Sequence, residues 1–571
     1  MTSVLAGPAA AVVDRDVADL VRGESAWARC DLAERRTLLE RVHAAVGRNA
    51  AEWARTAAGY KGLEPGSPLV GEEWISGPYA VLAALAALTR SVRALQAGGS
   101  PVDGLSIERA PGGRLAVRVL PVTVYDRLLL NGFRADVWMP PGMTQSTIRA
   151  AAGLALRRPT ETAGVGVVLG AGNITSIPVL DVLYELYANN RVVALKLNPI
   201  TDPLLGVFSR VLAPLIDVGG VRILTGGSDV GGYLVHHPRV GHVHLTGSVE
   251  THNAIVFGTG PEGSARKAAG TPLLTKPVTS ELGGVSPIIV LPGEWSRADL
   301  RFQAEHVATQ RLHNGGYNCI ASQVVVVSSD WPQRSAFLHE LRAAMASAAG
   351  RAAYYPGSDT RVADAVACYP EANTLGDTGR VLIDGLTVRA DEPALSTEYF
   401  APVMGVVELP GDAASFLAAA VEAANSSFAG TLGANLIAHP RTIAALGPVL
   451  DGAIAALRYG TIAVNAWTGV GYLTPGARWG AYPGHTLDDV QSGIGVVHNA
   501  VLLDGPERTV VRGPFRPAPR SIVHGELSLT PRPPWFVTNR TAATTGERLT
   551  RFAADPRWTR LPGVFASALR G

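Results

Sequence analysis

The sequence is short of net charge, cysteine and lysine. Fifty Lys and Arg residues stand against 48 Asp and Glu, so the 571-residue chain carries a formal charge of +2. This small net charge produces only a weak electrostatic field, which argues against nucleic acid or an anionic membrane surface as the partner. The three cysteines are an odd number and too few for a disulfide framework, which favours a reducing compartment. The scarcity of lysine reflects a base-composition bias toward arginine.

Long apolar runs and a signal peptide are also missing. The longest apolar run, residues 79–88, is about half the length that a membrane-spanning helix needs. The N-terminus has no positively charged region before its short apolar stretch and reaches Asp14 and Arg15 almost at once. With 47% hydrophobic and 17% charged residues, the composition is that of a soluble globular protein of several domains. We therefore expect a cytoplasmic protein without a membrane span.

Apolar periodicity predicts helices first and strands later. From about 14 to 97, apolar residues recur every three or four positions between charges, which indicates helices. The segments RLAVRVLPV and FRADVWMPP then alternate apolar and polar residues, which indicates strands. Between Gly164 and Val290, glycine turns and amphipathic stretches separate four short apolar runs, VGVVLG, VVALKL, VRILTG and HVHLTG. This alternation predicts parallel strands with helical crossovers, hence an open α/β sheet.

A second set of strands follows the first. Its runs are SPIIVL, SQVVVV, GVVELP, ANLIAH and GTIAVN, and helices such as SFLAAAVEAAN separate them. The same reasoning predicts a second α/β domain. From about Thr474 the chain is rich in Pro and Arg. We expect this last part to wrap over other parts of the fold or over another subunit rather than to form a core of its own.

Two places at the ends of predicted strands suit a phosphate-bearing ligand. The segment LGAGNITSIP lacks the G-x-G-x-x-G spacing, so a tight turn is its simplest interpretation. Lys196 ends the run VVALK, at the edge where open α/β sheets bind ligands, although a surface lysine is the alternative. Thr246, Gly247 and Ser248 offer backbone N–H groups at a strand-to-helix turn, or else an ordinary helix cap.

The strongest single candidate is Cys319 in the segment NGGYNCIAS. It lies in a turn rich in Gly and Asn that leads into the strand SQVVVV. In such a turn a thiol can be exposed while backbone N–H groups point at a developing oxyanion. A buried, inert cysteine is the usual alternative. Cys30 and Cys368 have no comparable surroundings and are interpreted as structural.

Seven segments, in the same order, resemble the signature segments of the NAD(P)-dependent aldehyde dehydrogenase superfamily. They are VGVVLGAGNITSIP, VVALKLNP, VRILTGGSDVGGYLVHHPRVGHVHLTGSVE, SELGGVSPIIV, HNGGYNCIAS, EYFAPVMGVVE and GTIAVN. The resemblance covers about 160–470 and implies an α/β fold of two open domains, cofactor-binding and catalytic, plus an oligomerisation or bridging extension. We expect the cofactor-binding domain at 1–115 and 160–278, a strand-rich insertion and candidate oligomerisation element at 116–159, the catalytic domain at 279–473, and a bridging segment with a C-terminal tail at 474–571.

The resemblance also implies catalytic roles. Cys319 takes the place of the nucleophilic cysteine, and Glu281 in ELGG takes that of the general base. Asn173 stands where the family's Pro-Trp-Asn segment supplies an oxyanion-hole amide, although Ala171 and Gly172 replace Pro-Trp here. No metal is required by this chemistry.

For the cofactor, the resemblance implies a second set of residues. Lys196, Gly226, Gly247 and Ser248 match the places that bind the adenosine and pyrophosphate, and Glu398 in EYFAPV matches the glutamate that holds the nicotinamide ribose. Pro199 stands where NAD-preferring members usually have a glutamate. A carboxylate that would repel a 2′-phosphate is therefore missing, and the expected cofactor is NAD or NADP.

Together these assignments predict oxidation of an aldehyde to a carboxylic acid through a cysteine thioester, with hydride transfer to NAD(P). An acyl-CoA or acyl-thioester reductase is the alternative within the enzyme class, although CoA-using branches generally lack the glutamate base. A catalytically silent binding protein of the same fold is the alternative outside that class. The expected partners are a small-molecule aldehyde and further copies of this chain, as a homodimer or homotetramer. The sequence does not name the aldehyde.

Overall fold

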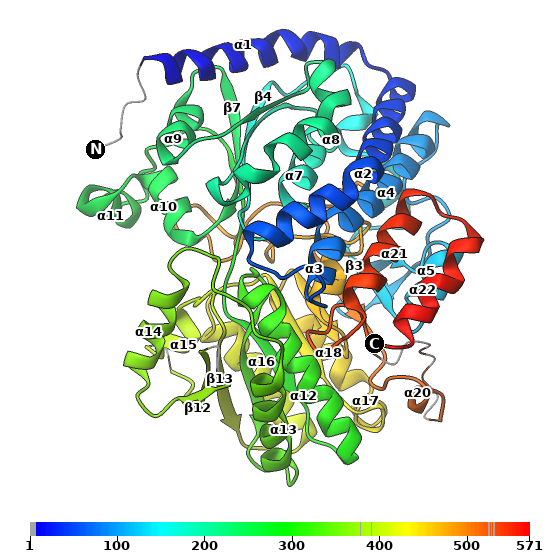
Figure 1. The fold of residues 1–571 in the computed structure, drawn as a ribbon, viewed down its shortest axis with the longest axis vertical. Coiled ribbons are helices and arrows are strands. Elements are labelled where there is room, and N and C mark those ends of the chain that lie inside the picture. Colours follow the sequence, from blue (N-terminus) through cyan, green and yellow to red (C-terminus); the bar gives the residue numbers. More distant parts are fainter. Residues whose placement is uncertain (1–6, 377–378, 390, 524–525, 527, 529–531) are drawn as a thin grey trace.

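Two β-sheets flanked by helices organise the chain (Figure 1). The computed structural model describes residues 7–376, 379–389, 391–523, 526, 528 and 532–571. Within these residues, one sheet has six strands and the other has eleven. The predicted α/β fold of two open sheets is confirmed.

The smaller sheet is parallel except at one edge. Its strands follow the order β16-β8-β7-β4-β5-β6, and the short β16 pairs antiparallel with β8. Their bounds are β4 (Val165–Leu169), β5 (Val192–Lys196), β6 (Val221–Leu224), β7 (Val240–Gly247), β8 (Val278–Leu282) and β16 (Gly493–Ile494). The four apolar runs of the sequence thus form β4 to β7. Because these strands are parallel, their carboxyl ends meet at one edge of the sheet.

Helices from both the N-terminus and the crossovers cover this sheet. They are α1 (Pro8–Arg29), α2 (Leu32–Tyr60), α3 (Val70–Trp74), α4 (Ala80–Gln96), α7 (Ile177–Tyr187), α8 (Leu205–Asp217), α9 (Ser228–His236), α10 (Val249–Phe257) and α11 (Gly260–Ala268), with η1 (Ile75–Tyr79), η2 (Leu154–Arg157) and η3 (Pro199–Leu204) between them. The helix α2 begins with a capping box, in which Asp31 and Glu34 satisfy each other's backbone N–H groups. In the core, Trp53 of α2 donates its indole N–H to Thr175 at 2.9 Å. This bond ties the helical layer to the loop that carries Asn173.

The larger sheet follows the order β1-β2-β3-β17-β15-β14-β9-β10-β13-β12-β11. Its strands are β1 (Ile107–Ala110), β2 (Arg114–Leu120), β3 (Arg134–Trp138), β9 (Ser286–Val290), β10 (Ser322–Ser328), β11 (Asn373–Leu375), β12 (Arg380–Leu386), β13 (Val403–Leu409), β14 (Gly433–Ile437), β15 (Thr461–Val464) and β17 (Arg508–Arg512). The strands from β17 to β12 are parallel, and the outer ones are antiparallel. The helices of this half are α12 (Arg297–Leu312), α13 (Arg334–Ser347), α14 (Ser358–Cys368), α15 (Pro393–Ser396), α16 (Ala413–Ser426), α17 (Pro440–Leu446), α18 (Pro448–Ala456) and α19 (Thr468–Tyr472), with η4 (His313–Gly316) after α12.

The strands β1 to β3 extend the larger sheet within this one chain. They pair with β17, which comes from the C-terminal segment. The region also carries the short helices α5 (Val124–Leu129) and α6 (Gln145–Ala151). Contacts of the 116–159 insertion with a second copy of the chain stay a prediction.

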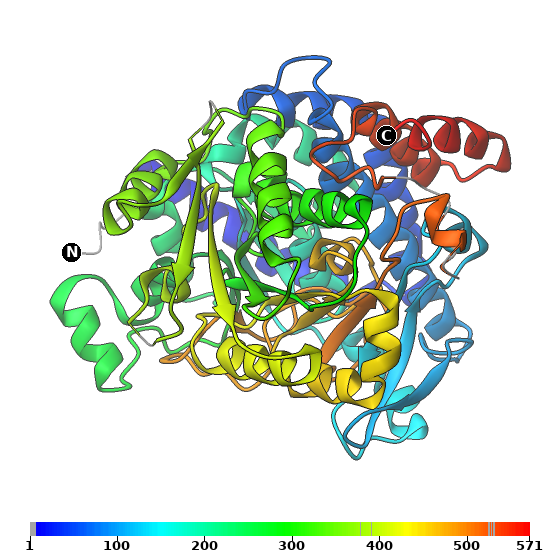
Figure 2. The ribbon, with the colours of Figure 1, turned by 90° about the horizontal axis from the view of Figure 1, so that it is seen from below.

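The C-terminal tail packs on the N-terminal helices. Its helices are α20 (Arg520–Val523), α21 (Ala542–Ala554) and α22 (Leu561–Ala568), with η5 (Trp558–Arg560) before the last. Figures 1 and 2 both show α21 and α22 beside the first helices of the chain. The ring of Tyr125 in α5 lies 5.0 Å from that of Phe552 and 5.2 Å from that of Trp558, centroid to centroid. The tail therefore covers α3 and α5 rather than forming a separate unit.

Two helical segments, 70–96 and 199–217, are apolar and long enough to cross a membrane by length and composition alone. In the first, 67% of the apolar window is buried inside the protein, and in the second 44%. The first also contains the buried acids Glu72 and Glu73 and a break in its helical geometry at Gly77. Because core helices of soluble proteins pass the same test, these segments are weak evidence for a membrane span.

Candidate active site

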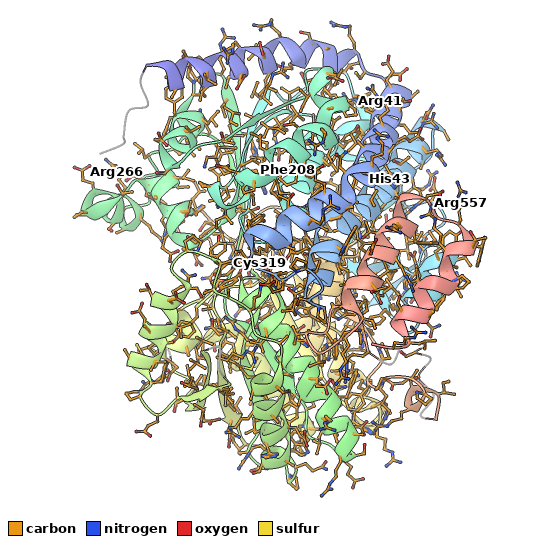
Figure 3. The ribbon with its side chains drawn as sticks, in the orientation of Figure 1. Arg41, His43, Phe208, Arg266, Cys319 and Arg557 are labelled. Atoms are coloured by element: carbon orange, nitrogen blue, oxygen red, sulfur yellow. The ribbon has the colours of Figure 1, made fainter. Side chains whose placement is uncertain are left out.

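A large cleft runs along the carboxyl edge of the smaller sheet and ends at Cys319. Its volume is about 1740 Å³. Residues at the ends of β4, β5 and β7 line one side, and residues 396–400 and 429–430 line the other. Figure 3 shows Cys319 at the junction of the two halves of the molecule. The predicted residues that line this cleft are Asn173, Lys196, Gly247, Ser248, Glu281, Cys319 and Glu398.

Gly226 is the predicted site residue that the structure places just outside the cleft lining. Its neighbour Gly227, which directly precedes α9, lines the cleft instead. Gly226 has a φ of +129°, and a Cβ there would lie 2.5 Å from Cγ2 of Val230. The residue is therefore needed for the shape of the turn before α9.

Cys319 and Glu281 lie in hydrogen-bonding contact. The Cys319 Sγ donates to Oε1 of Glu281 at 3.1 Å. Cys319 comes from the turn between η4 and β10, and Glu281 comes from the end of β8, where it is 1% exposed. The indole N–H of Trp479 donates to the same Oε1 at 2.8 Å. The other oxygen, Oε2, is buried and has no hydrogen-bond partner among the residues that the structure describes.

Burial dominates the electrostatics of this centre. It raises the pKa of the Cys319 thiol well above its usual range, and the carboxylates of Glu281 and Glu398 raise that pKa further. Burial also raises the pKa of Glu281, against the opposing effects of His498, Trp479 and Cys319. A thiol that donates to a buried, basic carboxylate is a nucleophile held next to its own proton acceptor. The pair can therefore exchange one proton over a single hydrogen bond.

Asn173 lies against the same turn from the opposite side. Its side-chain Nδ2 donates to the carbonyl of Tyr317 at 2.9 Å, two residues before Cys319. The residue is 6% exposed and lines the cleft. Because a primary amide has two N–H donors, the bond to Tyr317 leaves a second N–H for a group bound beside Cys319.

At the far end of the cleft, Lys196 is the last residue of β5 and is 8% exposed. Burial lowers the pKa of Lys196, while the nearby Asp202 and Asp229 oppose this effect. Pro199 begins η3, and the preceding Asn198 accepts the N–H of Ile200. The lysine is thus a partly desolvated cation at the edge where ligands bind, not a free surface lysine.

The turn after β7 provides both a helix cap and backbone N–H groups that face the cleft. Ser248 caps α10 by accepting the N–H of Thr251 at 3.2 Å, and it lines the cleft together with Gly247. The N-terminus of α10 therefore opens into the cleft, where helix N–H groups favour an anion. The basic residues Arg266 and Lys267 of α11 also line this end, on the arm that projects from the molecule in Figure 3.

Glu398 is half-buried and lines the same cleft. Burial raises its pKa to about 8, although Arg311 and the N–H of Gly284 act in the other direction. A side chain on Gly283 would collide with the Glu398 carboxyl group, so glycine is needed at this close approach. The arrangement gives the middle of the cleft a polar hydrogen-bonding group.

Sequence reasoning missed three residues behind the base. Asp181 of α7 is fully buried, and its carboxylate lies 3.0 Å from Nε2 of His498 and 3.6 Å from Nε2 of His244. Burial opposes the charged form of His244, but Asp181 outweighs it and raises the pKa of that imidazole. These residues are far apart in the sequence, so no local pattern marks them. Trp479, which was also missed, stands in the closing segment that only loosely resembles the family.

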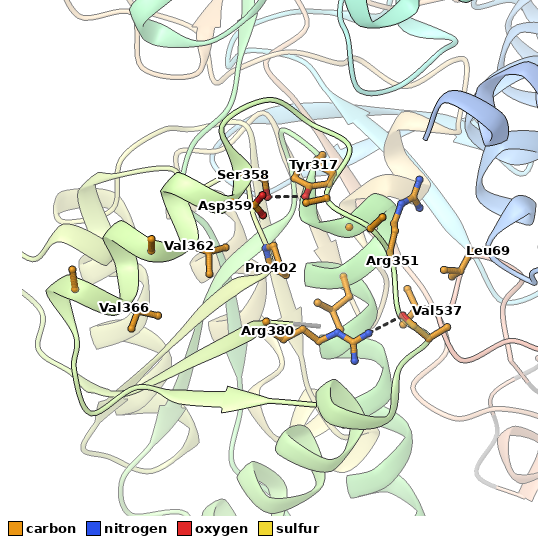
Figure 4. Close-up of a pocket in the computed structure, with 18 residues that line it drawn as sticks. Leu69, Tyr317, Arg351, Ser358, Asp359, Val362, Val366, Arg380, Pro402 and Val537 are labelled. Atoms are coloured by element: carbon orange, nitrogen blue, oxygen red, sulfur yellow. Dashed lines mark hydrogen bonds between the residues drawn. The ribbon is translucent and has the colours of Figure 1, made fainter. Parts of the chain in front are cut away.

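A second cavity lies on the other side of the Cys319 turn. Its volume is about 580 Å³, and Gly315, Tyr317 and Arg351 line it together with apolar residues. Figure 4 shows Tyr317 and Arg351 at one end of this cavity and Val366 at the other. Neither Cys319 nor Glu281 lines it. Among the described ranges, no group of three His, Cys, Asp or Glu residues is placed to hold a metal ion.

Comparison with known proteins agrees with this geometry. The family model described as the aldehyde dehydrogenase family matches residues 146–356. The 3,6-anhydro-alpha-L-galactose dehydrogenase of Streptomyces coelicolor is 27% identical over 318 residues, which are 56% of this chain and 51% of that protein. The 1-pyrroline-5-carboxylate dehydrogenase of Bacillus mycoides is 30% identical over 169 residues, 29% of this chain and 31% of that protein. The chain thus spans about half the length, or less, of these curated relatives.

Solved structures show the same fold. Indole-3-acetaldehyde dehydrogenase complexed with NAD+ has a TM-score of 0.59 and 18% identity, with 88% of each chain covered. A mutant of aldehyde dehydrogenase C from Pseudomonas syringae, complexed with NAD+ and octanal, has a TM-score of 0.59 and 17% identity, over 89% of this chain and 90% of that one. The fold of the chain is that of solved aldehyde dehydrogenases. The segment 146–356 matches the aldehyde dehydrogenase family.

Proposed function

We propose that the protein oxidises an aldehyde to a carboxylic acid through a thioester on Cys319, with NAD or NADP as the hydride acceptor. The observation that carries this proposal is the 3.1 Å contact between Cys319 Sγ and Glu281 Oε1, beside a buried Oε2 that lacks a partner among the described residues. The family match of residues 146–356 supports it, as do the relatives that are named dehydrogenases.

The cleft fits a dinucleotide. Lys196 would bind the adenosine end, Gly247 and Ser248 at the start of α10 would face the pyrophosphate, and Glu398 would accept hydrogen bonds from the second ribose. The fit rests on one continuous cleft that both Lys196 and Cys319 line, and on the Glu398 carboxyl group held against Gly283. When bound, the oxidised nicotinamide accepts a hydride from the carbon attached to sulfur.

In the first half-reaction, Glu281 takes the proton of the Cys319 thiol through the existing hydrogen bond. The sulfur then forms a bond to the aldehyde carbon, and the carbonyl π electrons move to the oxygen. The free N–H of Asn173 and the backbone N–H of Cys319 donate to that oxyanion. The protein thus supplies the nucleophile, its base and the stabilisation of charge from the Cys319 turn, the end of β8 and the loop after β4.

Between the half-reactions, Glu281 releases the thiol proton to solvent and becomes a carboxylate again. In the second half-reaction, Glu281 acts on water, and the proton that it takes from water returns to the Cys319 thiolate at the end. Its carboxylate takes a proton as the water oxygen attacks the thioester carbonyl, and the carbon–sulfur bond then breaks to release the acid and the Cys319 thiolate. The unpartnered Oε2 of Glu281 is the acceptor that such a water needs. Trp479 holds the other oxygen and so keeps the carboxylate oriented.

The two alternatives predict different behaviour. An acyl-CoA or acyl-thioester reductase would not need a base for hydrolysis, and the buried Glu281 in contact with Cys319 argues against it. A silent binding protein would not need the combination of Cys319, Glu281, Asn173 and Glu398 around one cleft. Neither alternative is favoured.

An aldehyde panel assayed with NAD and with NADP tests the proposal. Aliphatic, aromatic and sugar-derived aldehydes are each incubated with the protein, and reduced cofactor and acid are measured together. We expect equal amounts of both products from at least one aldehyde. Reduced cofactor without acid, or no reaction with any member of a broad panel, would contradict the proposal. A homo-oligomeric state and a cytoplasmic location remain predictions that sedimentation and cell fractionation can check.

A further inference from the structure

We propose that Lys61 and Glu73 are positioning residues for the nucleophile turn and the oxyanion amide. With Glu72 and Arg351 they form a buried charge cluster behind residues 313–319, which we call the brace. The inference rests on the proposed function, because it concerns how the same site is held. Three members of the brace, Lys61, Glu72 and Glu73, come from the N-terminal helical region, and Arg351 follows α13. None of the four lies in the seven segments that resemble the family.

Lys61 sits at the centre of the brace. It directly follows α2 and is 0% exposed. Its Nζ donates to both carboxylate oxygens of Glu73, at 3.0 and 2.9 Å, and to the backbone carbonyl of Asn173 at 2.9 Å. It also lies 3.3 Å from Oδ1 of Asn314. One ammonium group therefore joins an acid of α3 to both sides of the proposed oxyanion site.

Asn314 connects the nucleophile turn, residues 313–319, to the brace. Its φ of +54° places it in the left-handed region, which Asn tolerates better than most residues. Its backbone N–H donates to Oε2 of Glu72 at 3.0 Å, and its Oδ1 accepts from Arg351 at 3.1 Å. Its Nδ2 donates to the carbonyls of Asn173 at 3.2 Å and Tyr317 at 3.0 Å. These bonds fix the backbone on which Cys319 is carried.

Burial of this charge cluster costs desolvation free energy. Lys61, Glu72, Glu73 and Arg351 are each at least nine-tenths buried, and their two positive and two negative charges balance. Well-packed apolar side chains of similar size often stabilise a fold equally well. Their value here lies in where they bind. Lys61, Glu72 and Arg351 bond directly to Asn314 or to the Asn173 carbonyl. Glu73 holds Lys61 and Arg351 in place by pairing with both.

Packing alone does not hold the turn in place. The 580 Å³ cavity lies against Gly315 and Tyr317, so the turn has free space on that side (Figure 4). Gly315 and Asn314 both have positive φ values. Hydrogen bonds to the brace are therefore what prevents the turn from moving into the cavity.

The C-terminal tail packs against α3, the short helix that carries the two acids of the brace. The helix α21 packs on α3, where a side chain on Gly71 would collide with Ala542. Gly546 is equally close to α3, since a Cβ there would lie 3.0 Å from the Cβ of Trp74. The acids Glu72 and Glu73 thus lie on a short helix that is held between the tail and the nucleophile turn.

The test compares three variants with the wild type. Lys61→Met removes the ammonium group and leaves Glu73 unpaired, which also threatens folding. The double variant Lys61→Met/Glu73→Met removes the whole pair and keeps the remaining charges of Glu72 and Arg351 balanced. Arg35→Met is the matched control, because Arg35 is a buried cation of the same helix that binds the carbonyls of Trp27, Cys30 and Pro159 instead.

We expect the double variant to melt near the wild-type temperature while its acylation rate falls about a hundredfold, the effect of a displacement of about 1 Å. Its KM for NAD(P) should stay close to that of the wild type, because the brace does not line the cleft. Backbone amides of 313–319 should exchange hydrogen faster in the double variant but not in Arg35→Met. This exchange readout does not depend on any catalytic activity.

Two outcomes would overturn the inference. The first is a folded double variant whose acylation rate and amide exchange match those of the wild type. The second is an equal loss of rate in Arg35→Met, which would show a general effect of stability. A wild-type protein that oxidises no aldehyde of a broad panel would contradict the proposed function, whereas faster exchange in the double variant alone would still support the brace.

Discussion

Trp479 donates its indole N–H to Oε1 of Glu281 at 2.8 Å. The two residues are 198 positions apart in the chain, and the bond joins the closing segment to the end of β8. It fixes one carboxylate oxygen and leaves Oε2 for a water molecule. A residue from outside the segments that resemble the family thus orients the proposed base.

The substitution Trp479→Phe tests this orientation. The ring contact with Tyr472, now 5.3 Å between centroids, can persist, but the hydrogen bond to Glu281 is lost. A hydrogen bond to a charged group contributes about 1.5–3 kcal/mol, so deacylation should slow about tenfold to a hundredfold. Burial raises the pKa of Glu281, and the indole of Trp479 opposes this effect. Without the indole the pKa of Glu281 should rise further, so the acid limb of the variant's pH–rate profile should move to higher pH. A pH–rate profile measures the shift, and an unmoved acid limb would count against the assigned role.

Removal of the nucleophile should abolish turnover. Cys319→Ala deletes the sulfur from a turn without altering the far end of the cleft, so cofactor binding should stay nearly intact. Cys30→Ala and Cys368→Ala are the controls, since both residues lie outside the cleft lining. Steady-state rates at saturating aldehyde and a cofactor titration check both statements. Wild-type turnover by Cys319→Ala would show that the nucleophile is wrongly assigned.

The cofactor preference should respond to residue 199. Because a proline replaces the carboxylate that would repel a 2′-phosphate, the ratio of kcat/KM for NAD to that for NADP should be modest. Pro199→Glu should shift this ratio toward NAD, through hydrogen bonds from the ribose hydroxyls and repulsion of the phosphate. Pro199→Gln keeps the size without the charge and serves as the control. Strict NAD specificity of the wild type would refute the argument.

Alkylation of Cys319 should reveal the effect of the neighbouring carboxylate. Burial, Glu281 and Glu398 together raise the pKa of the thiol, so iodoacetamide should modify Cys319 slowly at neutral pH and faster as pH rises. Glu281→Gln removes a negative charge and lowers that pKa, so the variant should react faster at pH 7. Peptide mass spectrometry separates Cys319 from the exposed Cys368. Slower alkylation of the variant would contradict this prediction, because it would show that the thiol cannot ionise without Glu281 as its proton acceptor.

Local patterns predicted much of the fold but little of what supports the site. The runs VGVVLG and VVALKL form β4 and β5, and Lys196 ends β5 as expected, because strand alternation and turn residues are encoded within a few positions. The contact of Trp479 with Glu281 and the brace around Lys61 join residues far apart in sequence. No periodicity marks such pairs, so they depend on the tertiary structure.

The place of Gly226 also depends on the tertiary structure. The family resemblance implies a cofactor-binding role for it, which stays a prediction; its positive φ shapes the turn before α9, and Gly227 lines the cleft. A glycine in sequence signals a backbone requirement without saying whether a ligand or a neighbouring side chain imposes it. Here the neighbour is Val230.

The central claim is that Glu281 drives hydrolysis of a Cys319 thioester, and a burst experiment on Glu281→Gln tests it most directly. The variant keeps the shape of the side chain but loses its basicity, and general-base assistance is worth roughly a hundredfold to ten-thousandfold. Because Glu281 raises the pKa of the Cys319 thiol, the thiol of the variant can lose its proton to solvent instead, and the first half-reaction should survive. Mixing the variant with aldehyde and NAD(P) should therefore give a burst of about one reduced cofactor per active site, then a slow phase. Intact-protein mass spectrometry should show an acyl adduct that is absent from Cys319→Ala, and added CoA should not restore fast turnover. Rapid CoA-dependent turnover by both wild type and variant, with no adduct and little acid, would contradict the account.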